Sequence, residues 1–348
     1  MHGGDIYNND IDIDFSVNLN PYVDPKIKEQ IASAAREGFL RARSYPDITQ
    51  TGVRLAIACS EDVENECIIA GSGASELITG IVHALLPKTA LLPRPCFSGY
   101  ERALHAAGCA VRSYMMKEEN GFSLTSDNPA DMVDAADIMF IADPQNPSGK
   151  NIDEDLIIRI LESAKNSGTT VVIDESFMPL SQKYMLFAKD RGRYRQMLEK
   201  FDNVYFVRSY TKSFALPGIR MGYCISRKEN IQKLAAHLPE WNLSTVAADI
   251  MRLCAKISQD PAFFAETYEL IKREKDMLSG ELTGLGYKVF DSDTLYLLIK
   301  GQKGLYEKLL ERGILIRKCD DFCGLDERFY RIAVKTHPEN ERLIGAMR

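Results

Sequence analysis

The chain has 348 residues, of which 45% are hydrophobic and 26% charged, a globular composition with length for about two domains. The net charge of −6 argues against a nucleic-acid-binding protein, although a locally basic site for an anionic substrate is still compatible with it. The polar N-terminus shows no targeting segment and no run of 18 apolar residues occurs, so we expect a cytoplasmic protein without a membrane span. The eight cysteines are scattered without a CxxC pair, so we expect no metal site.

From about residue 67 onward, short apolar runs alternate with segments of helical spacing. Continuous apolar runs of this length are typical of strands that are covered on both faces of a sheet. One helix is clear over 153–167, where Asp153 can cap the first turn and Gly168 can end the last. The alternation predicts an α/β domain with a largely parallel sheet. The predicted strands are 67–70, 90–92, 110–114, 138–142, 170–174, 204–207 and 222–225.

After about residue 227, long helical segments are predicted over 229–237, 244–258 and 261–285. Strands over 294–299, 314–317 and 330–334 follow, with a short helix near 304–312. This pattern predicts a second, smaller α+β domain. We therefore expect an N-terminal arm over 1–30 that packs with the small domain, a large domain over 31–230, and the small domain over 231–348.

The segment 209–223 carries the strongest chemical signal. It follows an apolar strand, so Lys212 can point into a cleft and form a Schiff base if its amine is deprotonated at neutral pH. Ser209 and Arg220 add a hydroxyl and a guanidinium, which are good phosphate ligands. Pro217 and Gly218 turn the chain back, so that Arg220 can approach the same site.

Four further segments supply what pyridoxal 5′-phosphate (PLP) requires. Asp174 ends an apolar strand, and an ionised carboxylate there can keep a pyridine nitrogen protonated. Asn146 follows another strand and can donate to the ring 3′-oxygen. The glycine-rich turn 71–76 opens a helix whose free amides suit a phosphate, and Phe97 can stack on the ring. Each segment alone is also explained by turn or core chemistry, so the prediction depends on their combination.

Together these motifs resemble, in order and over nearly the whole chain, the fold-type I, class I/II aminotransferase family of PLP enzymes. The resemblance implies that Lys212 and Asp174 are catalytic, with PLP bound to Lys212 and its pyridinium held by Asp174. It also implies a large PLP-binding domain and a homodimer with shared active sites. Phe177 departs from the family pattern, because many relatives have a tyrosine there that gives the 3′-oxygen a second donor. The other cofactor-binding residues that the resemblance implies are Ala74, Ser75, Phe97, Asn146, Ser209, Arg220 and, from the neighbouring subunit, Tyr45.

Substrate residues follow from the same resemblance. Arg331 matches the family arginine that clamps the substrate α-carboxylate. The segments 2–6, 14–21, 314–319, 324–326 and 340–343 look like the L-threonine-O-3-phosphate decarboxylases of cobalamin biosynthesis. Histidinol-phosphate aminotransferases usually lack the His-Gly-Gly start and the Gly-Leu-Asp element of residues 324–326. The implied substrate is a small phosphorylated amino acid, bound by His2, Gly3, Asn18, Arg317 and Arg331.

The reaction type depends on positioning. In PLP chemistry the substrate bond held perpendicular to the ring is the one that breaks, so the same cofactor supports decarboxylation and transamination. The resemblance favours decarboxylation of L-threonine O-3-phosphate to (R)-1-amino-2-propanol O-2-phosphate. A histidinol-phosphate aminotransferase or a related class I/II aminotransferase is the alternative. A non-catalytic PLP-fold regulator is a third hypothesis, which the acidic composition and the lack of a recognisable DNA-binding module disfavour.

Overall fold

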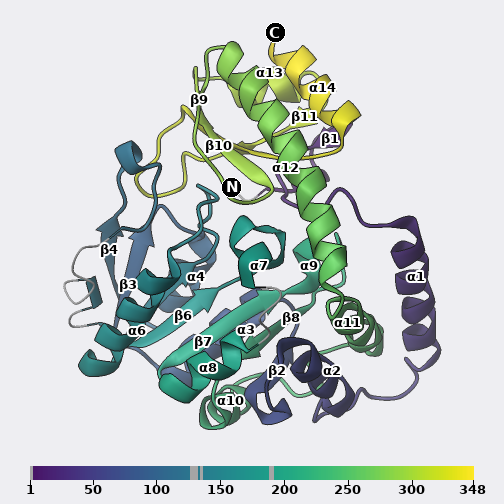
Figure 1. Cartoon of the computed structure of the whole chain (residues 1–348), viewed down its shortest axis with the longest axis vertical. Helices are drawn as coiled ribbons and strands as arrows, with labels where there is room; N and C mark the ends of the chain where they lie inside the picture. The colour runs from purple at the N-terminus through teal and green to yellow at the C-terminus, as the bar shows by residue number, and fades with distance from the viewer. Residues whose placement is uncertain (1–2, 126–131, 134–135, 188–191) are drawn as a thin grey trace.

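The computed structural model of the chain describes residues 3–125, 132–133, 136–187 and 192–348 (Figure 1). The helices are α1 (Pro25–Leu40), α2 (Thr51–Glu61), α3 (Ala74–Leu85), α4 (Ser98–Ala106), α6 (Glu154–Ser167), α7 (Gln182–Phe187), α8 (Arg193–Lys200), α9 (Tyr210–Ser213), α10 (Lys228–Ala235), α11 (Thr245–Ile257), α12 (Pro261–Gly284), α13 (Leu305–Leu310) and α14 (His337–Met347). Short 3-10 turns lie at Asn65–Cys67, Glu118–Asn120 and Met178–Leu180.

A seven-stranded sheet forms the centre of the larger part of the molecule. Its spatial order is β2-β8-β7-β6-β5-β3-β4, and only β8 runs antiparallel to its neighbours. The predicted mostly parallel α/β sheet is therefore confirmed, with each strand within two residues of its expected position. The strands are β2 (Ile68–Gly71), β3 (Thr89–Arg94), β4 (Ala110–Met115), β5 (Ile138–Ala142), β6 (Thr170–Asp174), β7 (Val204–Ser209) and β8 (Gly222–Ile225).

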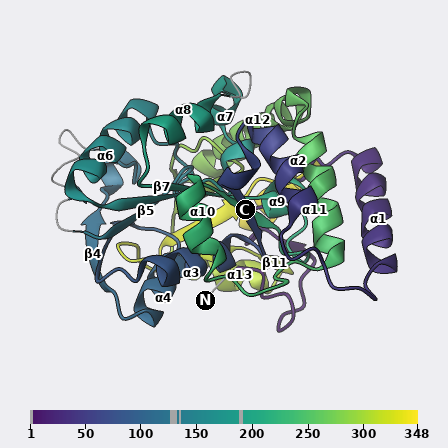
Figure 2. The same cartoon turned by 90° about the horizontal axis from the view of Figure 1, so that it is seen from below.

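Apolar side chains leave this sheet on both faces. On β6, Val171 and Ile173 join one core with Ile157 of α6, whereas Val172 joins a second core with Leu77 of α3. Figure 2 shows the corresponding layers, with α6 and α8 on one side of the strands and α3 and α4 on the other. Because both faces are covered, the strands are continuous apolar runs instead of alternating ones.

The helix predicted over 153–167 is present as α6. Its N-cap Asp153 accepts a hydrogen bond of 3.1 Å from the Leu156 amide, which satisfies one of the free donors of the first turn. Gly168 ends the helix with φ of +76°, a left-handed conformation that glycine adopts without strain.

The C-terminal part is built on a four-stranded antiparallel sheet of order β12-β13-β10-β9, covered by α12, α13 and α14 (Figure 1). Its strands are β9 (Lys288–Val289), β10 (Tyr296–Lys300), β12 (Arg317–Lys318) and β13 (Phe329–Ala333). The prediction of one strand over 314–317 is wrong. The segment divides at Ile316 because β11 (Ile314–Leu315) pairs with β1 (Ile13–Asp14), while β12 pairs with β13 in the other sheet.

The N-terminal segment packs against the C-terminal sheets. β1 and β11 are parallel, and the Phe15 amide donates to the Leu315 carbonyl at 2.7 Å. Phe15 is fully buried in the same core as Leu297 and Ile332. In contrast, α11 packs against α1 and α2 (Figures 1 and 2), so the boundaries at residues 30 and 230 stay a prediction. Among the helices of the described ranges, none is both long enough and apolar enough to cross a membrane.

Candidate active site

A cavity of about 220 Å³ opens where the parallel strands of the large sheet end. The carboxyl ends of strands are the usual binding edge of an open α/β sheet. β5, β6 and β7 lead directly into the cavity, and the four-stranded sheet and the N-terminal segment close its other side. Apart from Tyr45 and His2, every predicted site residue lines it: Gly3, Asn18, Ala74, Ser75, Phe97, Asn146, Asp174, Ser209, Lys212, Arg220, Arg317 and Arg331.

Two predicted residues are not among those that the structure brings together. The Tyr45 side chain is 81% exposed and contacts Trp241, with ring centroids 4.8 Å apart, beside a separate surface pocket. A residue that reaches another subunit must have an exposed side chain, so the position of Tyr45 is compatible with the predicted role. The role itself stays a prediction. His2 lies outside the described residues.

Lys212 has the electrostatic environment of a nucleophile. It lies in the short helix α9, whose N-cap Ser209 accepts from the Thr211 amide at 3.1 Å and donates to the Met221 carbonyl at 2.8 Å. Burial, followed by the nearby Arg331 and Arg220 charges, lowers the pKa of Lys212 from its ordinary value to about 8. The neutral amine that carbonyl attack requires is therefore present at about a tenth of the total at pH 7, far more than for an ordinary lysine.

The Asp174 carboxylate is fixed by neighbours that the sequence analysis missed. Its Oδ2 accepts from the Tyr100 hydroxyl at 2.6 Å, and its Oδ1 accepts from the Ser176 hydroxyl at 2.6 Å and the Ser176 amide at 3.0 Å. Burial, and then the Asp174 charge, raise the pKa of Tyr100, so its hydroxyl stays a donor. The Asp-x-Ser spacing signals the Ser176 contact. Tyr100 comes from α4, and nothing in its local sequence marks it.

The turn before α3 forms a narrow cradle. Ala74 and Ser75 begin the helix, where backbone amides point outward and favour an anion. Gly73 has φ of +85°, and a Cβ placed on it would lie 2.6 Å from a guanidinium nitrogen of Arg220. A Cβ on Gly222 would lie 2.6 Å from the Ala74 amide nitrogen. Glycine at these two positions therefore lets Arg220 and β8 approach the helix terminus closely.

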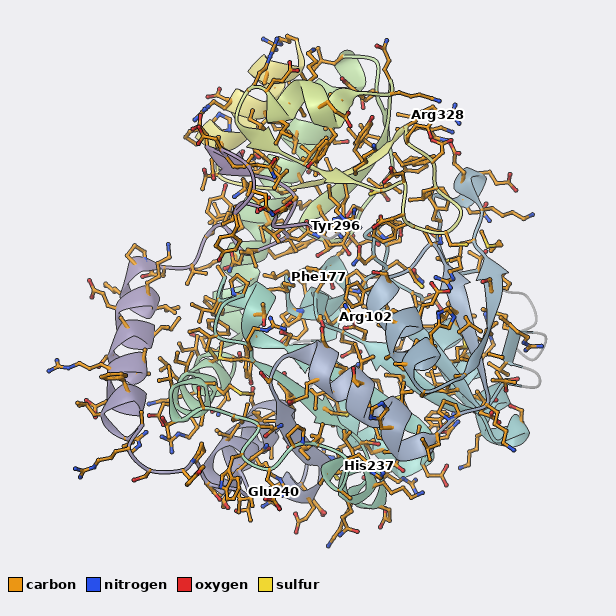
Figure 3. All side chains as sticks on the ribbon, turned by 180° about the vertical axis from the view of Figure 1, so that it is seen from behind. Arg102, Phe177, His237, Glu240, Tyr296 and Arg328 are labelled. Atoms are coloured by element: carbon orange, nitrogen blue, oxygen red, sulfur yellow. The ribbon has the colours of Figure 1, made fainter. Side chains whose placement is uncertain are left out.

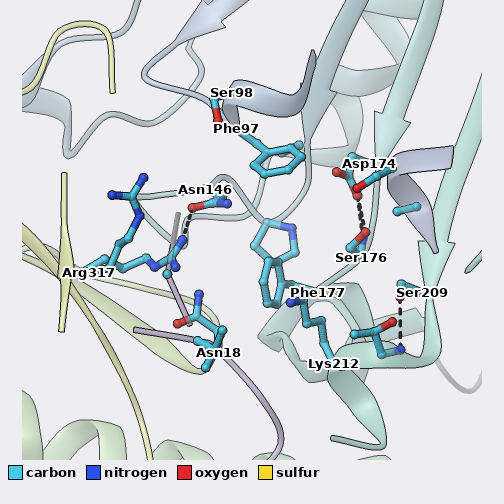
Figure 4. A pocket seen from close by; sticks show the side chains of 18 of the residues that line it. Asn18, Phe97, Ser98, Asn146, Asp174, Ser176, Phe177, Ser209, Lys212 and Arg317 are labelled. Atoms are coloured by element: carbon cyan, nitrogen blue, oxygen red, sulfur yellow. Dashed lines mark hydrogen bonds between the residues drawn. The ribbon is translucent and has the colours of Figure 1, made fainter. Parts of the chain in front are cut away.

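Opposite Lys212, an arginine and two asparagines border the cavity. Arg331 donates to Asn146 Oδ1 at 2.6 Å and to the Ser16 carbonyl at 2.9 Å. Because the Asn146 side-chain oxygen accepts from Arg331, the side-chain nitrogen of Asn146 can serve as a donor to a ligand. Asn18 is 2% exposed, and neither polar atom of its side chain has a hydrogen-bond partner among the described residues. Figure 4 shows both asparagines at the cavity wall. A buried amide without hydrogen-bond partners costs stability, so Asn18 marks a place for a polar ligand.

Arg317 and Arg331 face each other across the antiparallel pair of β12 and β13. Both are buried, at 5% and 7% exposure, and burial lowers the pKa of Arg331. Arg317 donates to both oxygens of Asp321, at 2.8 and 2.9 Å. Among the lining residues, the charged side chains are four cations and the single carboxylate of Asp174. The cavity therefore favours a ligand with several negative charges.

Aromatic rings border the cavity from two sides. Phe97 lies on one wall (Figure 4), and the Phe177 ring centroid lies 5.5 Å from the Lys212 amine. Phe177 also meets Tyr296 edge-to-face, with centroids 5.1 Å apart, at the junction of the two sheets (Figure 3). The Tyr296 hydroxyl donates to the Gln145 carbonyl at 2.7 Å, so it is used in joining the two parts.

These groups fit PLP. The cavity provides an amine with a lowered pKa for an aldehyde, a carboxylate for a ring nitrogen, an aromatic wall for a flat ring, and a cationic cradle for a phosphate. The unsatisfied Asn18 amide and the two facing arginines remain for a polar, anionic substrate. This fold and this set of groups define a fold-type I PLP enzyme.

Similarity to known proteins agrees with this class. The chain belongs to the class I and II aminotransferase family, which it matches over residues 10–347, and it is a PLP-dependent enzyme. It is 35% identical, over 100% of this chain and 93% of the relative, to a Caldanaerobacter subterraneus protein named provisionally as a threonine-phosphate decarboxylase. It is 31% identical to the adenosylcobalamin biosynthesis bifunctional protein CobDQ of Leptospira interrogans, over 96% of this chain and 38% of that protein.

A solved structure shows the same fold. The histidinol-phosphate aminotransferase from Clostridium acetobutylicum is similar with a TM-score of 0.84 and 28% identity, covering 96% of this chain and 98% of that one. Both subfamilies considered from the sequence are thus represented among the relatives.

Proposed function

We propose that the protein decarboxylates L-threonine O-3-phosphate to (R)-1-amino-2-propanol O-2-phosphate in cobalamin biosynthesis, with PLP as cofactor. The observation that carries this proposal is the facing pair of buried arginines, Arg317 and Arg331, across the cavity from Lys212. A substrate with both a carboxylate and a phosphate matches two guanidiniums at one end of the site. The name of the Caldanaerobacter subterraneus relative favours the same reaction, and the name of the Leptospira interrogans relative favours the same pathway.

Different residues of the cavity would bind different parts of PLP. When bound, PLP withdraws electrons from the bonds of the substrate α-carbon. Lys212 would attach the aldehyde, and Asp174, itself fixed by Tyr100 and Ser176, would keep a proton on the pyridine nitrogen. Phe97 would pack on the ring, and Asn146 would donate its amide hydrogen to the 3′-oxygen.

The residues that would hold the cofactor phosphate are Ala74, Ser75, Ser209 and Arg220.

The substrate-facing residues orient the bond that breaks. Arg331 binds the α-carboxylate and Arg317 binds the phosphate, while the Asn18 amide, unsatisfied within the described chain, hydrogen-bonds to the substrate. Gly3 lies against Ser16 at the cavity edge, where the N-terminal arm is proposed to meet the substrate phosphate. His2, which the same proposal includes, lies outside the described residues. After loss of CO2, Lys212 is the lining amine that can deliver a proton to the α-carbon.

The proposal includes a cytoplasmic homodimer in which Tyr45 of each copy reaches the cofactor phosphate of the other. Tyr45 is strongly exposed, and Phe39 and Leu40 nearby in the chain are exposed at 71% and 59%. A second copy that covered these large apolar side chains would bury surface that the single chain exposes, which supports the proposal. The oligomeric state in solution, measured by light scattering, tests this point.

A single assay tests the reaction. Purified holoenzyme is supplied with L-threonine O-3-phosphate and no keto acid, and released CO2 is measured with the phosphorylated amino alcohol. We expect both products in equal amounts. The matched variant Lys212→Ala should release none while keeping its fold.

Histidinol-phosphate aminotransferase is the second candidate, favoured by the close structural match to the Clostridium acetobutylicum enzyme. In the same assay, histidinol phosphate is supplied with 2-oxoglutarate, and in the reverse direction glutamate is supplied with the phosphorylated ketone that corresponds to histidinol phosphate. Robust glutamate-dependent transamination without CO2 would replace the decarboxylase proposal by this one. A protein that turns over neither substrate would contradict both.

A further inference from the structure

Asp321 places a negative charge beside a pocket for anions. It follows β12, directly before Phe322, which lines the cavity. The Asp321 side chain is 32% exposed, and both of its oxygens accept from Nη2 of the buried Arg317. An anion-binding pocket normally gathers donors and positive charge, and a fixed carboxylate next to its guanidinium opposes a bound anion.

The contact with Asp321 uses part of the hydrogen-bonding capacity of Arg317. A guanidinium has five N–H donors, of which Arg317 uses two for Asp321 and one for the Lys318 carbonyl. The guanidinium carbon of Arg317 lies 5.1 Å from the centroid of the Phe322 ring. Arg317 is thus held in one orientation, and it meets an incoming anion with its charge already shared.

Arg331, the cross-strand neighbour, differs in this respect. The hydrogen bonds of its guanidinium within the described ranges go to neutral acceptors, Asn146 Oδ1 and the Ser16 carbonyl. Its Nε has no partner there. The two facing guanidiniums therefore present unequal net positive charge to a ligand, and the smaller net charge is at Arg317. Figure 4 shows Arg317 at the cavity wall.

We infer that Asp321 is a specificity-determining residue that aims Arg317 and limits the positive charge offered to the substrate. It makes a doubly charged phosphate bind less tightly at Arg317 than the two arginines alone would allow, while a singly charged group is affected less. The inference rests on the proposed function only in assigning the phosphate end of the substrate to Arg317.

The test uses holoenzyme, in which PLP already occupies the cofactor-phosphate cradle. Binding of inorganic phosphate and of formate at pH 8 is followed through the absorbance of the bound cofactor. Asp321→Asn keeps an acceptor for Arg317 but removes the charge, so we expect phosphate to bind about five-fold more tightly, and formate less than two-fold. Asp321→Ala also loses the acceptor, so we expect it to bind phosphate at least about three-fold more weakly than Asp321→Asn.

Asp320→Asn is the matched control, because Asp320 is 40% exposed, pairs with Lys318 at 3.3 Å, and does not line the cavity. An unchanged phosphate-to-formate ratio in Asp321→Asn, or an equal change in Asp320→Asn, overturns the inference. Equal affinities in Asp321→Asn and Asp321→Ala overturn the aiming role. Turnover is measured separately: a wild-type enzyme that leaves L-threonine O-3-phosphate intact contradicts the proposed function, whereas the phosphate-to-formate ratio still decides the role of Asp321.

Discussion

The hydroxyl of Tyr100 on α4 donates a 2.6 Å hydrogen bond to Oδ2 of Asp174 at the end of β6, and so joins a helix on one face of the large sheet to the carboxylate at the cavity. We expect Tyr100→Phe to weaken PLP binding about ten-fold, because a hydrogen bond to a charged group contributes about 1.5–3 kcal/mol. The dissociation constant of PLP, measured by fluorescence titration of apoenzyme, checks this.

A second buried tyrosine is the control for that measurement. The Tyr205 hydroxyl, on β7, has no hydrogen-bond partner among the described residues. Tyr205→Phe should therefore leave PLP affinity unchanged. Equal effects of the two substitutions would show that Tyr100 acts through packing instead of through Asp174.

The reactivity of Lys212 should depend on pH around its lowered pKa. The neutral amine is the nucleophile, and its fraction rises as pH increases through about 8. Apoenzyme mixed briefly with PLP and trapped with borohydride should give an adduct at Lys212 whose rate of formation is half-maximal near pH 8. Because the Arg331 charge contributes to the lowering, Arg331→Gln should move the midpoint upward. A wild-type midpoint near the ordinary lysine value would contradict the prediction.

Gly73 should be intolerant of a side chain. Alanine there would place a Cβ 2.6 Å from Arg220, at a φ of +85° that costs about 1–3 kcal/mol for a residue other than glycine. We expect Gly73→Ala to weaken PLP binding at least about ten-fold. Gly108 is the matched control, because it also has a positive φ, of +72°, but nothing lies within 4 Å of the position that a Cβ would take. Gly108→Ala should reduce stability without changing PLP affinity.

A buried ion pair behind the site should matter for stability. Glu175, directly after Asp174, is fully buried and accepts from Arg193 at 2.8 Å and from the Tyr194 hydroxyl. Breaking one side of a buried pair costs about 3–5 kcal/mol, so Glu175→Gln should lower the free energy of unfolding by about 3 kcal/mol. Urea denaturation measures this change.

The surface pair of Glu162 and Lys200, each about half exposed, is the comparison for this measurement. Glu162→Gln should cost under about 1 kcal/mol, because exposed ion pairs contribute little. Equal losses at Glu175 and Glu162 would show that burial does not determine the contribution of the inner pair.

The parts of the fold that the sequence predicted are those set by local patterns. Continuous apolar runs located the strands of the large sheet, and the spacing around Asp153 and Gly168 located α6. The cofactor residues Asn146, Asp174 and Lys212 were predicted because each lies at or shortly after the end of a strand, whereas the substrate residues were predicted from the family resemblance. Since parallel strands end at one edge, local order along the chain was sufficient to bring Asn146, Asp174 and Lys212 together.

The parts that the sequence did not predict depend on distant partners. The division of 314–317 into β11 and β12 follows from pairing with β1 and β13, which no local pattern encodes. Tyr100 lies 74 residues before Asp174 in an ordinary helix, and only the packing of α4 on the sheet brings the two together.

The pairing of residues 13–14 with 314–315 has a consequence for synthesis of the protein. On the ribosome, the segments that carry Asp174 and Lys212 are synthesised long before residue 315, so β1 stays without its partner strand after all strands of the large sheet have been made. A nascent chain released before β13 was synthesised would lack Arg331 and the strand with which β12 pairs. Such a fragment would retain the lysine but not the pair of arginines, and so would have a reactive amine without substrate selection.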